Sequence, residues 1–120
     1  MKKINIAIVG SRTFDDYNRM KSVMDTFIDI HKEKEICIVS GGARGADLLG
    51  ERYAKESGLE FKCFPADWGK HGRVAGFVRN KDIVKESDRI VAFWNNKSSG
   101  TKNTLDEAER NDIPSYIVSF

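Results

Sequence analysis

Residues 38–50, IVSGGARGADLLG, pass from an apolar run through a glycine-rich loop into a segment with helical spacing. The apolar run ends at Ser40, and Ala46, Leu49 and Tyr53 then recur at the interval of one helix face. A loop of this kind between a strand and a helix is a tight turn in many proteins and half of a phosphate site in others. The rest of the chain decides between the two.

Short runs rich in Ile, Val and Phe recur along the chain, and each gap between them is long enough for a helix. They predict five strands, at Ile4–Val9, Ile36–Val39, Leu59–Phe64, Arg89–Trp94 and Ser115–Phe120. The four gaps carry apolar side chains at helical spacing, among them Met20 with Met24 in the first and Val74, Phe77 and Val84 in the third. Strict alternation of strand and helix predicts an α/β fold, with a doubly wound parallel sheet and helices on both faces.

Composition sets the outer limits on function. The 120 residues suffice for one domain, and 20 Lys plus Arg against 18 Asp plus Glu give a formal charge of +2, which does not require a nucleic-acid partner. Cys37 and Cys63 lie in apolar runs with neither a CxxC spacing nor a nearby His pair, which predicts buried, reduced thiols and no metal site. The start, MKKINIAIVGSR, fits neither a signal peptide nor a membrane span, so we expect a cytoplasmic protein without a membrane partner.

Glycines and basic residues are concentrated in the loops that follow the strands. In a parallel sheet these loops share one edge, where ligands bind in the crevice at which the strand order reverses. Seven of the ten glycines fall there: Gly10, Gly41, Gly42, Gly45, Gly69, Gly72 and Gly100. The same loops, with the start of the third helix, carry Arg12, Arg44, Lys70, Arg73, Arg79 and Lys97. Glycine backbone, helix N-termini and cations on one edge predict an anionic ligand.

The two best-known phosphate motifs are absent. GSRTFD, residues 10–15, lacks the GxGxxG of dinucleotide dehydrogenases, and GGARGADLL, residues 41–49, lacks the GK[ST] of a P-loop. Hydride transfer and nucleoside triphosphate hydrolysis are therefore not supported, and no cofactor is implied.

Several candidate residues have a structural alternative. Asp47 in the first turn of the second helix either offsets the helix dipole or accepts hydrogen bonds from a ribose. Thr101 or Ser99 caps the fourth helix, contacts phosphate, or does both. Trp68 is either an exposed loop residue or a surface on which a base stacks.

Four segments together resemble the SLOG superfamily, most closely its small YspA-like, cpYpsA-related domains of bacteria and their phages. They read GSRTFDDY, SGGARGAD, DWGKHGRVAGFVRN and AFWNNKSSGT, and they span Gly10 to Thr101 in consistent order. The resemblance implies a single Rossmann-like domain over residues 1–120, with a five-stranded, mainly parallel sheet in the order 3-2-1-4-5. It also implies binding of nucleotides or nucleotide-derived molecules, including NAD-derived signals, and it leaves a homo-oligomer open.

Two groups of SLOG relatives suggest further functions. LOG-type phosphoribohydrolases cleave the N-glycosidic bond of a nucleoside monophosphate; their SGG loop is matched by Ser40 to Gly42, but Thr104 stands where their later motif has a glutamate. The DNA-processing protein A family uses a similar fold on single-stranded DNA. Here the near-neutral charge balance, without a basic face interleaved with aromatics, argues against nucleic acid.

We therefore expect a binding module for a nucleotide or an NAD- or ADP-ribose-like ligand, acting as a sensor or by sequestration. The residues expected to bind it are Gly10, Ser11, Arg12, Ser40, Gly41, Gly42, Arg44, Gly45, Asp47, Trp68, Arg79, Asn80, Lys97, Ser99, Gly100 and Thr101. The first alternative is a nucleotide N-glycosidase that uses Asp47 or Asp67 with Arg79, and the second is single-stranded DNA binding.

Overall fold

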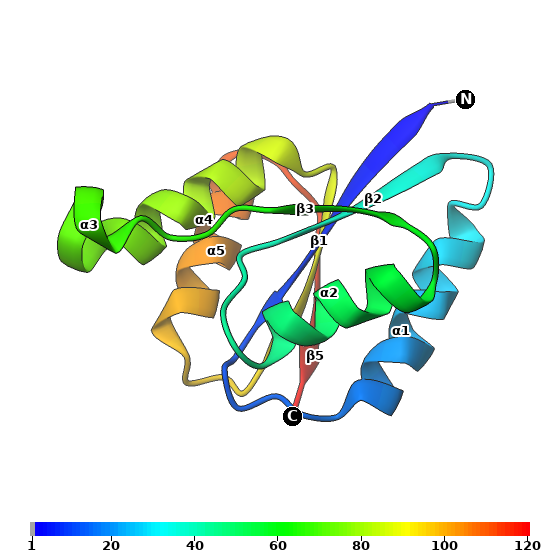
Figure 1. The fold of residues 1–120 in the computed structure, drawn as a ribbon, viewed down its shortest axis with the longest axis horizontal. Helices are drawn as coiled ribbons and strands as arrows, with labels where there is room; N and C mark the ends of the chain where they lie inside the picture. Colours follow the sequence, from blue (N-terminus) through cyan, green and yellow to red (C-terminus); the bar gives the residue numbers. More distant parts are fainter. Residues whose placement is uncertain (1) are drawn as a thin grey trace.

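The central strand of the sheet is β1 (Lys3–Gly10), whose side chains are buried on both faces. Ile4, Ile6 and Ile8 point to one face, and Ala7 and Val9 point to the other, as the two-residue period of a strand requires. A near-continuous apolar strand of this kind needs a layer of helices on each side. The computed structural model describes residues 2–120 and shows these layers (Figure 1).

The five strands pair in parallel throughout, in the order β3-β2-β1-β4-β5. β2 (Glu35–Ser40) and β4 (Arg89–Trp94) flank β1, while β3 (Glu60–Cys63) and β5 (Ser115–Ser119) form the edges. Both the predicted α/β class and the predicted strand order 3-2-1-4-5 are confirmed. The order reverses between β1 and β4, so the loops that follow these two strands diverge there.

Two helices cover each face of the sheet (Figure 1). α1 (Tyr17–Ile30) and α2 (Ala46–Glu56) bury Met20, Met24 and Tyr53 against the isoleucines of β1. α4 (Ala75–Glu86) and α5 (Ser99–Arg110) bury Ile83 and Ala108 on the opposite face. This arrangement directs the N-termini of α2 and α5 toward the edge at which the parallel strands end.

The connection from β3 to β4 differs from the prediction of one helix. It contains a short helix, α3 (Trp68–His71), then a 3₁₀ turn, η1 (Gly72–Val74), and only then α4. Gly72 has φ +57°, a conformation that ends α3 and that glycine adopts without strain. Of the three apolar residues noted at helical spacing in this connection, Val84 is buried, whereas Val74 and Phe77 are 52% and 45% exposed.

The edge position of β3 explains a second difference. Cys37 on β2 is buried, whereas Cys63 on β3 is exposed, contrary to the prediction that both thiols are buried. A strand that is covered on one side only leaves its side chains in contact with solvent. None of the helices within residues 2–120 is long and apolar enough to cross a membrane.

Candidate functional site

A crevice with two lobes opens at the carboxyl edge of the sheet. The main lobe has a volume of about 590 Å³ and is lined by the end of β1, by the loops after β1, β2 and β4, and by residues of α2, α3, η1, α4 and α5. The second lobe, of about 390 Å³, is lined by the loops after β1, β2 and β3 and by α3 and α4. Arg12, Ala43, Trp68 and Arg79 line both lobes, so the two meet along a common wall.

Five of the six predicted cations line this crevice. Arg12 and Arg79 line both lobes, Arg73 and Lys97 line only the main lobe, and Arg44 lines only the second. Lys70 lines neither lobe. Seven ion pairs form among residues 2–120, and none of them includes any of these six side chains. The crevice therefore has a concentration of positive charge that the surrounding side chains leave largely unneutralised.

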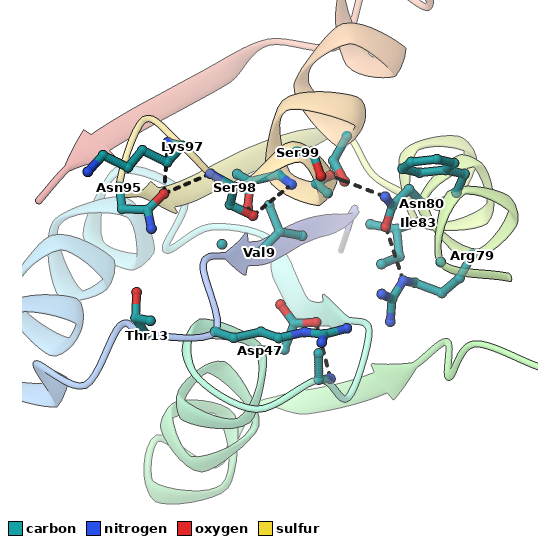
Figure 2. Close-up of a pocket in the computed structure, with 18 of the residues that line it drawn as sticks. Val9, Thr13, Asp47, Arg79, Asn80, Ile83, Asn95, Lys97, Ser98 and Ser99 are labelled. Atoms are coloured by element: carbon teal, nitrogen blue, oxygen red, sulfur yellow. Dashed lines mark hydrogen bonds between the residues drawn. The ribbon is translucent and has the colours of Figure 1, made fainter. Parts of the chain in front are cut away.

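One carboxylate, that of Asp47, lies in the main lobe next to Arg79 (Figure 2). Asp47 is only 6% exposed, and its Oδ2 accepts a hydrogen bond from the Ala43 N–H at 3.3 Å. Burial raises the pKa of Asp47 to about 6, although the Arg79 guanidinium, the N–H groups of Ala43 and Gly41, and Arg12 all act to lower it. Near neutral pH this group therefore changes between a proton donor and an acceptor.

Arg79 is held in place by two hydrogen bonds. Its Nη1 donates to the Gly41 carbonyl at 2.7 Å, and its Nε donates to Asn80 Oδ1 at 3.0 Å. Asn80 in turn donates from Nδ2 to the Gly100 carbonyl and to Asn103 Oδ1. Figure 2 labels Asn80 and Arg79 side by side in this part of the lobe. This chain of bonds connects the loop after β2 to the first turn of α5, so these two segments keep a fixed relative position.

Glycines allow the loops to approach closely. A Cβ on Gly45 would lie 2.5 Å from the Ser11 carbonyl oxygen, and Gly45 has φ +82°. Ser11 and Ser40 are both buried: the Ser11 hydroxyl accepts from the Asn95 N–H, and the Ser40 hydroxyl donates to the Asp47 carbonyl. These three predicted site residues position the loops, and none of them lines a lobe.

The N-terminus of α5 is built by the loop after β4. Asn95 Oδ1 accepts from the N–H groups of Lys97 and Ser98, each at 2.9 Å (Figure 2). Ser98 is the N-cap, because its hydroxyl accepts from the Thr101 N–H; the prediction that Thr101 or Ser99 caps the helix is wrong by one to three positions. The N–H groups of Ser99 and Gly100 have no acceptor within residues 2–120, and both residues line the main lobe.

The two remaining candidates differ in position. Trp68 lines both lobes and is 54% exposed, so its ring is available to a ligand. Asp67 lines neither lobe; its carboxylate accepts from the Lys70 N–H at 3.0 Å and caps α3. Within residues 2–120 no three or more His, Cys, Asp or Glu side chains gather to hold a metal ion.

Several residues that line the main lobe were not among the predicted binding residues, and three of them are informative. Asn95 could have been identified, since an asparagine at the carboxyl end of a strand commonly shapes a turn. Phe77 was noted only for its helical spacing with Val74 and Val84, and that spacing does not show that its side chain is exposed and lines the lobe. Thr104 lies in the wall with its hydroxyl donating to the Gly100 carbonyl, at the position where the LOG resemblance would require a glutamate.

Comparison with known proteins gives a family and a set of fold neighbours. Residues 4–71 match the family described as the YspA, cpYpsA-related SLOG family. The Gene 61 protein of Mycobacterium phage D29 is 34% identical over 123 residues, which cover 96% of this chain and 94% of that protein.

Two solved structures share the fold at low sequence identity. DNA processing protein A (DprA) from Streptococcus pneumoniae has a TM-score of 0.79 and 17% identity, and DNA processing protein A from Helicobacter pylori has a TM-score of 0.66 and 19% identity. They match 98% and 95% of this chain, which spans only 50% and 64% of the respective DprA chains.

These neighbours overturn the argument against nucleic acid. The Helicobacter pylori structure is described by its single-stranded DNA binding mode, so the same fold serves a protein that binds nucleic acid. The argument failed because net charge averages over the whole chain and hides five cations gathered in one crevice. The aromatics that it found missing, Trp68 and Phe77, lie among these cations.

Proposed function

The chain belongs to the YspA, cpYpsA-related SLOG family, and from its crevice we propose that it binds a nucleotide or nucleotide-derived ligand through phosphate. The family and the DprA fold neighbours support a role related to nucleotides or nucleic acids. An NAD- or ADP-ribose-like molecule is our proposed ligand, with binding, as a sensor or by sequestration, as the function.

The observation that carries this proposal is the unneutralised charge of the crevice. Five cations line the two lobes, and no ion pair among residues 2–120 involves them. Asp47, a carboxylate that lines the main lobe with them, is buried and has a raised pKa. Like charges gathered without partners repel one another, and an anionic ligand relieves that repulsion. The N–H groups of Ser99 and Gly100 add the positive end of the α5 dipole.

The lining suggests where each part of a nucleotide lies. We place a phosphate against the first turn of α5, within reach of Lys97. Asp47 accepts hydrogen bonds from the ribose hydroxyls, and the base lies against the exposed ring of Trp68. A volume of about 590 Å³ falls within the range of about 300–1,000 Å³ that is usual for small-molecule sites.

A thermal-shift series tests the proposal. We expect AMP, NAD and ADP-ribose, each at saturating concentration, to raise the melting temperature, because a ligand at 100 times its Kd adds about 2.7 kcal/mol of stability. Adenosine without phosphate should shift the melt far less. If no phosphorylated compound changes the melting temperature of the parent protein, the proposal is wrong.

A nucleotide N-glycosidase remains the second candidate, because Asp47 with a pKa of about 6 lies beside Arg79 in the main lobe. Such a carboxyl group can act as a general acid or base near neutral pH. Thr104, however, supplies no carboxylate where the LOG resemblance would require one, so binding without cleavage is the better supported function. Chromatography after incubation with AMP and NAD tests this, since release of adenine or nicotinamide would establish cleavage.

A further inference from the structure

We propose that the second lobe is a second anion subsite, so that the ligand is a nucleotide with two phosphate groups, one in each lobe. This inference rests on the proposed function, because it takes the phosphate at α5 as the first of the two, but it replaces the adjacent phosphates of an NAD- or ADP-ribose-like ligand by phosphates on two sides of the nucleoside. Two sources share this chemistry: a free nucleoside bisphosphate and a phosphorylated dinucleotide unit of a single strand.

The lining of the second lobe is basic and contains no acid. Three of its nine residues are arginines, Arg12, Arg44 and Arg79, and no Asp or Glu lines it. Guanidinium groups bind phosphate through paired N–H donors. The remaining wall includes Gly41 and Gly42, which have no side chain, and Ala43, which has only a methyl group, so the backbone there can approach an anion closely.

Two of these arginines have no partner within the part of the chain that the structure describes. The guanidinium groups of Arg12 and Arg44 form neither an ion pair nor a side-chain hydrogen bond with any of residues 2–120. Arg79 is already fixed to the Gly41 carbonyl and faces Asp47. Asp47 lines the main lobe alone, so the second lobe has less negative charge available than the main lobe.

The residues shared by the two lobes indicate which part of the ligand lies between its two phosphates. Trp68 lines both lobes, as do Arg12 and Arg79. A ligand that fills both lobes therefore passes the exposed Trp68 ring, on which a base can stack. A nucleoside with phosphates on two sides has this arrangement, whereas a nucleoside monophosphate leaves the second lobe unused.

Titration calorimetry with three probes tests the inference. We would compare AMP, adenosine 3′,5′-bisphosphate and the 5′-phosphorylated dinucleotide pApA on the parent and on two variants. Arg44 is exposed and lines only the second lobe, and Lys97 is exposed and lines only the main lobe. Arg44→Ala and Lys97→Ala therefore remove one cation from each lobe without disturbing the core.

On the parent we expect at least tenfold tighter binding of one two-phosphate probe than of AMP. Arg44→Ala should abolish that difference between the two-phosphate probe and AMP, whereas Lys97→Ala should weaken all three probes. Lys32→Ala removes a charge from the connection at the opposite edge of the sheet and should change nothing. Tighter binding of the bisphosphate would indicate a free nucleoside bisphosphate as the ligand, and tighter binding of pApA would indicate a dinucleotide unit of a single strand.

The results that overturn the inference differ from those that overturn the proposed function. If AMP binds but neither two-phosphate probe binds more tightly, or if the gain survives Arg44→Ala, the second subsite is wrong and nucleotide binding stands. If none of the three probes binds the parent, both the subsite and the proposed function are wrong.

Discussion

At the residue scale, Asp47 combines deep burial with a charge that the fold only partly compensates. Its pKa in the folded protein, about 6, lies above the ordinary value of 3.8, so the folded state retains this proton at a pH where the unfolded state has released it. The contribution of Asp47 to the free energy of unfolding therefore falls as the pH rises from about 4 to about 6, and the deficit persists at neutral pH.

Asp47→Asn should remove this deficit. An asparagine has nearly the same shape and its oxygen can still accept from the Ala43 N–H, but it carries no charge to bury. We expect the variant to gain up to about 3 kcal/mol in free energy of unfolding at about pH 7.5 and almost nothing at about pH 3. Urea denaturation of the parent and the variant at the two pH values measures this difference in the free energy of unfolding. An equal difference at both pH values would contradict the prediction.

Gly41 has no Cβ, and this absence leaves room for the side chains of Arg79 and Asp47. A Cβ at this position would lie 2.9 Å from Asp47 Oδ2 and closer still to Arg79 Nη1. Gly41→Ala should therefore displace Arg79 from the Gly41 carbonyl and weaken AMP binding at least tenfold. Gly69→Ala is the matched control, since its Cβ would meet only Asp67 Oδ1, at 3.6 Å, and Gly69 lines neither lobe. Equal AMP affinities of the two variants by calorimetry would rule out this role for Gly41.

At the element scale, the start of α5 depends on one hydroxyl group. Ser98→Ala removes the acceptor for the Thr101 N–H, and loss of an N-cap costs about 1 kcal/mol of stability. We expect Ser98→Asn to retain most of that stability, because asparagine is a good N-cap residue. Urea denaturation of the three proteins is the measurement, and similar losses for both variants would show that the cap is not the cause.

The sequence predicted whole elements better than their ends, for identifiable reasons. β4 was placed correctly at Arg89–Trp94, since a central strand is apolar throughout its length. The edge strand β3 is shorter than the apolar pattern from Leu59 to Phe64, because only one neighbour pairs with it. The break at Gly72 could not be read from spacing, since Val74 and Phe77 continue the helical period and differ from core residues only in exposure.

At the scale of the whole molecule, the crevice could be predicted because topology brings the loops after parallel strands to one edge. Gly10, Gly41, Asp47, Arg79 and Gly100 come from four segments that are far apart in sequence, yet the parallel strand order alone indicates that these segments converge. The division into two lobes could not be predicted, since it depends on where the side chains of Arg12 and Trp68 lie. The gathering of five cations in the crevice could not be predicted from net charge either, because the whole chain has 20 basic and 18 acidic residues.

The same distribution of charge limits how a single strand of DNA can bind. Two lobes hold two phosphates, and we expect a strand that leaves them to make no further phosphate contacts. Each phosphate neutralised on a single strand contributes about −0.7 to the slope of log K against log salt concentration, which gives about −1.4 for two lobes. We expect fluorescence anisotropy at several salt concentrations to give this slope for pApA and for a strand of about 20 nucleotides alike. A slope that grows with strand length would instead show that nucleic acid follows a surface wider than the crevice.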